Sequence, residues 1–111
     1  MPFSEELRQA IRERKQVIAF YQGRRREMCP HVLGWKDDGT RRCLFYQFAG
    51  ETSKGPIGPS NPPGWRCMEV DRLTQLHLRD GDWHTERPKG GKYQHCMDRI
   101  ELEVRREPGW W

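Results

Sequence analysis

Arginine side chains carry the clearest chemical signal in this sequence. A guanidinium group is planar and holds phosphate or carboxylate groups through paired hydrogen bonds, and arginines outnumber lysines fifteen to five. Arg24, Arg25 and Arg26 are consecutive and follow Tyr21 closely. Such clusters neutralise phosphates, and exposed rings such as those of Tyr21 and Tyr46 stack on nucleobases. The pattern favours an anion-binding surface, although a solvated basic turn with both tyrosines in the core is an alternative.

Cysteines and histidines offer a second kind of chemistry. Cys29 and His31 are two residues apart and His95 and Cys96 are adjacent, which together supply two sulfurs and two imidazoles for a tetrahedral zinc ion. Residues two apart in a strand share a face, whereas adjacent residues do not, and the chain has no Cys-x-x-Cys pair. We therefore expect no metal and four reduced cysteines, with a framework of two disulfides as the alternative.

No arrangement of residues indicates a catalytic site. The acidic pairs at 37–38 and at 80 and 82 occur in turn sequences, where Asp and Gly are favoured for backbone reasons. The chain has neither the Gly-x-x-x-x-Gly-Lys-Ser/Thr phosphate loop nor the dinucleotide fingerprint. We expect a protein that is not an enzyme and that uses no cofactor.

Two tryptophans, Trp110 and Trp111, end the chain. If exposed, they form an apolar patch that fits a protein partner or a second copy; alternatively they pack over the domain's own core. They motivate a second functional hypothesis, a protein-interaction adaptor that docks through these tryptophans and the 50–64 loop.

Length and charge limit what else the chain can be. Its 111 residues fit one domain, 1–111. The net charge of +4 arises in the first fifty residues, which hold ten basic and six acidic side chains. No segment has the roughly 20 apolar residues of a membrane span or the pattern of a secretory leader. We expect no membrane association and a cytoplasmic location.

The elements that position these residues are mainly strands. Ser4 is a candidate cap for a helix over about 4–14, and a long mobile loop rich in Gly and Pro is expected over 50–64. Pro30 indicates an edge or bulged strand. The expected strands cover 16–21, 25–35, 42–48, 65–70, a segment that starts at 73, and 98–104. We predict a mainly β fold, a small partly open barrel of five to six strands over about 16–84, after one N-terminal helix and before a C-terminal strand and tail over about 93–111.

The order of these elements resembles that of WYL domains. The resemblance covers residues 5–84: a helix and a strand ending in Tyr21, an Arg-rich stretch, Cys29-Pro-His-Val-Leu33, a central strand over 39–48, a segment over 65–73 similar to the family's Arg-x-Phe-Arg-x-x-Arg-Ile, and a strand and turn over 76–83. The Trp-Tyr-Leu signature is replaced by Arg42-Cys43-Leu44 or Cys43-Leu44-Phe45, and Glu69 stands in place of a second arginine.

The resemblance implies an SH3- or Sm-like barrel that acts as the ligand sensor of bacterial transcription regulators, here without a DNA-binding part. It implies anion-binding roles for Arg66 and Arg72 and a position near the pocket for Tyr46. A structural ion pair of these arginines with Glu69 or Asp71 is the alternative. The leading hypothesis is a non-enzymatic module that binds a nucleotide or a short single strand of nucleic acid through these arginines and the 24–26 cluster.

Overall fold

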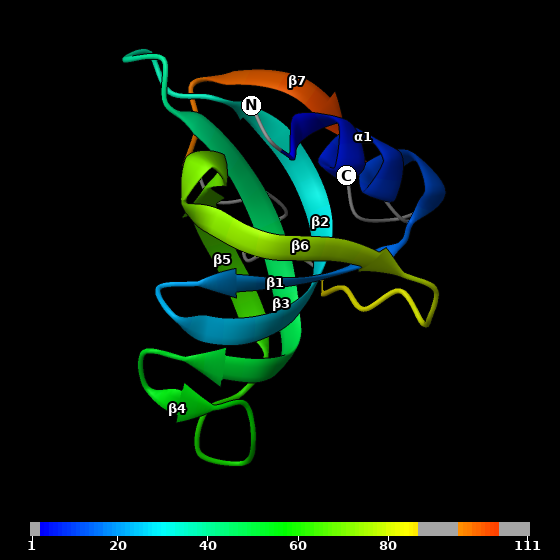
Figure 1. The fold of residues 1–111 in the computed structure, drawn as a ribbon, viewed down its shortest axis with the longest axis vertical. Coiled ribbons are helices and arrows are strands. Elements are labelled where there is room, and N and C mark those ends of the chain that lie inside the picture. The colour runs from blue at the N-terminus through cyan, green and yellow to red at the C-terminus, as the bar shows by residue number, and fades with distance from the viewer. Residues whose placement is uncertain (1–2, 87–95, 105–111) are drawn as a thin grey trace.

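The computed structural model describes residues 3–86 and 96–104. The fold is mainly β with one N-terminal helix, as the sequence predicts (Figure 1). In these ranges the elements are α1 (Ser4–Glu13), β1 (Gln16–Tyr21), β2 (Arg24–Trp35), β3 (Arg41–Thr52), β4 (Gly55–Pro56), β5 (Gly64–Glu69), the 3-10 turn η1 (Val70–Arg72), β6 (Leu73–Arg79) and β7 (Arg99–Glu103).

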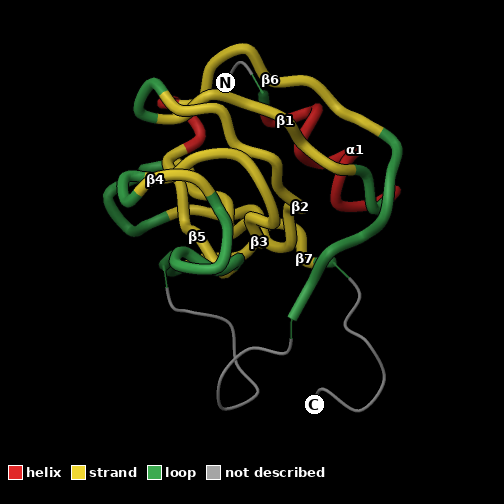
Figure 2. Tube along the Cα trace, turned by 90° about the horizontal axis from the view of Figure 1, so that it is seen from below, coloured by secondary structure: helices red, strands yellow, loops and turns green. Residues whose placement is uncertain are grey.

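The strands form one antiparallel sheet that curves back on itself without closing (Figure 2). Its hydrogen-bonded order is β4-β3-β2-β1-β6, with β5 paired to β3 and β7 paired to β2. One edge of β5 and one edge of β6 have no partner strand among the described residues. The result is a partly open barrel with a seam beside β5.

The helix covers one end of this barrel. Leu7, Ala10 and Ile11 recur on one helical face and are buried in the core. Ser4 is the first residue of the helix, and its hydroxyl makes no hydrogen bond, so its expected role as a cap is wrong. No helix in the described ranges combines the length and the apolar character that a membrane span requires.

Strand β2 is central, which corrects one half of the expectation for Pro30. The strand pairs with β1, β3 and β7, so it is not an edge. Pro30 lies at a register shift between β2 and β3, which confirms the bulge. Pairing with β1 ends at Met28 and pairing with β7 begins at Val32. Pro30, which has no N–H to donate, therefore lies between the part of β2 that pairs with β1 and the part that pairs with β7.

The 50–64 segment, expected as a loop, contains regular structure. It holds the end of β3, the short strand β4 and a bridge between Gly58 and Asn61. Asn61 is buried and donates hydrogen bonds to Thr52 Oγ1 at 2.8 Å and to the Gly55 carbonyl at 3.0 Å. Buried side-chain hydrogen bonds thus replace the hydrophobic contacts that the Gly- and Pro-rich sequence lacks. The β3–β4 hairpin lies at the end of the molecule away from α1 (Figure 1).

The expectation of four reduced cysteines is wrong for two of them. Cys67 in β5 and Cys96, which precedes β7, form a disulfide. Cys29 and Cys43 are free and buried. No local pattern predicts this pairing, because the partners are 29 residues apart and only the curvature of the sheet brings them together.

Candidate anion-binding site

The β1–β2 turn separates the three consecutive arginines onto two faces of the sheet. Gln22 and Gly23 have φ values of 56° and 73°, so they form a two-residue turn that fixes the register of the hairpin. In this register Arg26 pairs with the core residue Ala19. Paired residues share a face and successive side chains alternate between faces. Arg26 therefore faces into the barrel, whereas Arg25 faces away from it.

Arg26 is a buried charge with only neutral partners among the described residues. Its side chain is 4% exposed. Its two Nη atoms donate to Gln47 Oε1 at 3.3 Å, to the Tyr21 carbonyl at 3.3 Å and to Gln22 Oε1 at 3.4 Å, and its Nε has no acceptor. These hydrogen bonds are long for N–H···O bonds, which are usually 2.7–3.2 Å. The positive charge is poorly compensated.

A pocket of about 570 Å³ opens beside Arg26 at the mouth of the barrel. It lies between the β1–β2 turn, residues 52–54 of the β3–β4 hairpin, Asn61 in the segment after β4, and residues 65–68 of β5. Arg66 lines it because its register partner on β3 is the core residue Phe45, which places the arginine on the inward face. None of the described residues that line this mouth pocket is acidic.

Several positive charges lie close together at the mouth pocket and repel one another. Burial lowers the pKa of Arg26, and the neighbouring charges of Arg24 and Arg66 lower it further. Lys54 adds another cation at the rim. Since a low local dielectric strengthens the repulsion among the arginines, an anion that binds between Arg26 and Arg66 would relieve it.

Most other arginines of the barrel form ion pairs with carboxylates, unlike Arg26 and Arg66 at the mouth pocket. Eight arginines lie between residues 24 and 79. Five of them form ion pairs: Arg25 and Arg79 with Glu27, Arg41 with Glu101, and Arg42 and Arg72 with Glu69. Arg24, Arg26 and Arg66 pair with no carboxylate of residues 3–86 or 96–104. Two of these three unpaired arginines, Arg26 and Arg66, line the mouth pocket, and the charge of Arg24 acts on Arg26 from nearby.

Three residues predicted for the site lie elsewhere. Arg25 is on the opposite face and pairs with Glu27 at 2.9 Å. Arg72 is 66% exposed and its Nε lies 3.0 Å from Glu69 Oε2, so the structural ion pair is the arrangement observed. Tyr46 packs on the outer face, with its ring edge against Trp65, and burial raises its pKa. Trp110 and Trp111 lie outside the described residues.

Most residues of the pocket wall carry no signal in the sequence. Nothing in the sequence singles out Thr52 or Asn61, which line the pocket. One signal was present: Lys54 lies in the Gly- and Pro-rich segment, where a cation on a hairpin tip is a candidate for ligand contact. Tyr21, which was proposed as a stacking ring, does line the pocket, but the Arg26 guanidinium lies 5.6 Å from its ring centroid.

A buried histidine marks the outer face of the sheet. The ring of His31 lies between Trp65 and Trp83, with centroids 4.7 Å and 4.8 Å away. Its Nδ1 lies 2.8 Å from the Cys29 carbonyl and its Nε2 2.8 Å from Thr85 Oγ1, so the ring donates to the first and accepts from the second. Burial lowers the pKa of His31 to about 4. The ring is therefore neutral at physiological pH.

The zinc arrangement considered from the sequence does not form. Cys96 is bonded to Cys67 and has no thiolate to offer. Burial raises the pKa of the Cys29 thiol to about 11, and its Sγ accepts the backbone N–H of His84 at 3.3 Å. His95 lies outside the described residues. Within those residues no group of three or more His, Cys, Asp or Glu side chains is placed to hold a metal ion.

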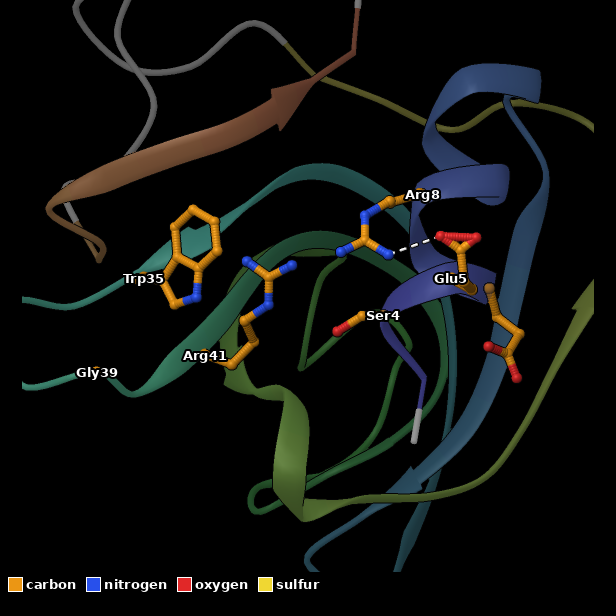
Figure 3. A pocket seen from close by; sticks show the side chains of 7 residues that line it. Ser4, Glu5, Arg8, Trp35, Gly39 and Arg41 are labelled. Carbon is orange, nitrogen blue, oxygen red and sulfur yellow. Dashed lines mark hydrogen bonds and ion pairs between the residues drawn. The ribbon is translucent and has the colours of Figure 1, made fainter. Parts of the chain in front are cut away.

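A second cavity, of about 620 Å³, lies at the start of α1 (Figure 3). Its cations are already compensated: Arg8 lies 2.7 Å from Glu5 and also contacts Glu101, which in turn pairs with Arg41. Glu5 and Glu6 line the cavity as well. This cavity is less suited to an anion than the mouth pocket.

No protein-family model matches the chain, and searches of curated proteins and of solved structures found no match either.

Proposed function

We propose that this protein is a non-enzymatic binding module that takes the anionic group of its ligand, a phosphate or a carboxylate, between Arg26 and Arg66. The observation that carries the proposal is the buried Arg26 guanidinium, which has no carboxylate partner among the described residues and faces a pocket with no acidic residue in its described wall. Buried charges in proteins are normally paired. A ligand anion supplies the missing partner.

The mouth of a small barrel is a common place for such a site. The ligand enters where the core ends, so its anionic group meets the inward-facing arginines while the rest of it stays near the rim. The nucleotide or short single strand expected from the sequence is one source of the phosphate. The likeness to WYL sensor modules and the adaptor hypothesis stay predictions.

Titration with inorganic phosphate tests the proposal. We expect saturable amide-shift changes in the 21–26 and 64–68 segments at a fixed ionic strength of about 0.15 M, where exposed charges are largely screened beyond ~8 Å. Arg66→Gln should weaken binding at least tenfold. Arg25→Gln removes the same charge one residue from Arg26 but on the opposite face, and should leave binding unchanged. Equal losses in both variants, or shifts that never saturate, would mean general attraction of polyanions.

A further inference from the structure

The edge of β5 that has no partner strand among the described residues points to the kind of ligand that brings the anion. The β3–β5 register runs from Gln47↔Gly64 to Arg42↔Glu69 without a shift. The Glu69 N–H points away from β3, because it donates to Tyr21 Oη at 3.2 Å. Alternate residues of a strand direct their backbone groups to the same side. The N–H and C=O of Cys67 therefore point to the seam as well.

A second contact agrees with this direction. The carbonyl of Trp65, two residues before Cys67, accepts a hydrogen bond from Arg66 Nη1 at 3.1 Å. Cys67 itself lines the mouth pocket, and no described residue hydrogen-bonds its backbone N–H or C=O across the seam. Within the described residues, the pocket therefore has an unpaired backbone N–H and C=O of β5 in its wall in addition to its arginines.

The seam is closed at one end. The Tyr21–Glu69 hydrogen bond crosses it where η1 begins, so a strand that lies along β5 from the Gly64 side must end near Cys67. Arg26 lies at this closed end, because its Nη2 bonds to the carbonyl of Tyr21. The poorly compensated charge of Arg26 thus lies where an added strand would terminate.

We infer that the ligand of the mouth pocket is the C-terminal end of an extended peptide, which adds two or three residues alongside β5 and places its terminal carboxylate between Arg26 and Arg66. This inference rests on the proposed function. Strand addition supplies backbone hydrogen bonds, and a carboxylate fits the paired donors of a guanidinium. A peptide end provides both groups in one ligand.

The experiment uses four probes at constant ionic strength. They are inorganic phosphate, adenosine monophosphate, an acetylated pentapeptide of alternating threonine and valine with a free C-terminal carboxylate, and the same peptide with a C-terminal amide. Binding is followed by amide shifts, and exchange of the Cys67 N–H with solvent is measured in the free and saturated states.

We expect the free-carboxylate peptide to bind and to slow Cys67 exchange at least tenfold. Amidation of the peptide, Arg66→Gln and Arg26→Met should each weaken its binding at least tenfold, and Arg25→Gln should not. Phosphate binding without peptide binding, tighter binding of the nucleotide than of the peptide, or equal slowing of Cys67 exchange by phosphate would overturn the inference and leave the proposed function intact. Absence of binding by every probe would refute both.

Discussion

Replacement of Arg26 by methionine separates a binding role from a structural one. Methionine keeps an unbranched, flexible side chain of comparable volume but removes the charge. If Arg26 stabilises the fold, the variant unfolds more easily. If Arg26 is retained for a ligand, the ligand-free variant is more stable than the natural protein.

The magnitude follows from the environment of the guanidinium. Replacement of a buried ionic group by an apolar one of similar volume is often neutral or stabilises by about 1–4 kcal/mol, and the unsatisfied Nε adds to the gain. The loss of three hydrogen bonds of 3.3–3.4 Å offsets part of it. We expect Arg26→Met to raise the free energy of unfolding by about 1–2 kcal/mol, a shift of about 0.5–1 M in the urea midpoint.

Urea unfolding with and without phosphate provides the assay. At ten times the dissociation constant, phosphate should stabilise the natural protein by about 1.4 kcal/mol and leave Arg26→Met unaffected. Arg41→Met is the matched control, because Arg41 is equally buried at 4% but pairs with Glu101 and stacks on Trp35 with its guanidinium 4.1 Å from the ring centroid. This control should destabilise. Destabilisation by both variants to a similar extent would refute the reasoning.

Three other predictions concern stability. The pKa of His31 is lowered to about 4 from 6.5, so the unfolded chain binds the proton first and stability is lost as pH falls below 6.5. The free energy of unfolding should drop by about 2 kcal/mol between pH 7 and pH 5, and His31→Gln should abolish this slope in urea titrations. Reduction of Cys67–Cys96 by a dithiol should lower the free energy of unfolding by roughly 3–4 kcal/mol, given a loop of 29 residues. An unchanged urea transition would show that the bond is absent in solution. A Cβ at Gly34 would collide with the Arg99 carbonyl, so Gly34→Ala should speed amide exchange across 99–103, and unaltered exchange would contradict the packing of β7 on β2.

Local patterns were enough to predict the helix and most strands. Alternation along the 42–48 segment predicts Cys43 and Phe45 on one face and Leu44 on the other, and all three are buried in the structure. The Asp-Gly turn at 36–40 forms as expected, with Gly39 at a φ of 90° and a hydrogen bond from the Lys36 N–H to the Thr40 carbonyl. These features depend on neighbours within a few residues, which the sequence displays directly.

Features that depend on the curvature of the sheet escaped prediction. Asn61 forms its hydrogen bonds because the β3–β4 hairpin folds back on itself, and Cys67 meets Cys96 because β5 and the segment before β7 converge. The carboxylate of Glu69 pairs with both Arg42 and Arg72, so this acidic residue also holds Arg72 away from the mouth pocket. No pattern among neighbouring residues predicts contacts between segments that are distant in the sequence.

The three consecutive arginines 24–26 lie in different environments because side chains alternate along a strand. A run of three cations in a strand cannot form one surface, since alternation sends the middle one to the opposite face. Here Arg25 meets Glu27 outside the barrel, while Arg26 is forced inward beside Arg66. Burial of this charge lowers the free energy of unfolding, because an apolar residue would fill the same position without desolvation of a cation. Contacts within the described residues leave Arg26 without a carboxylate partner, and the anion that we propose would supply one after folding.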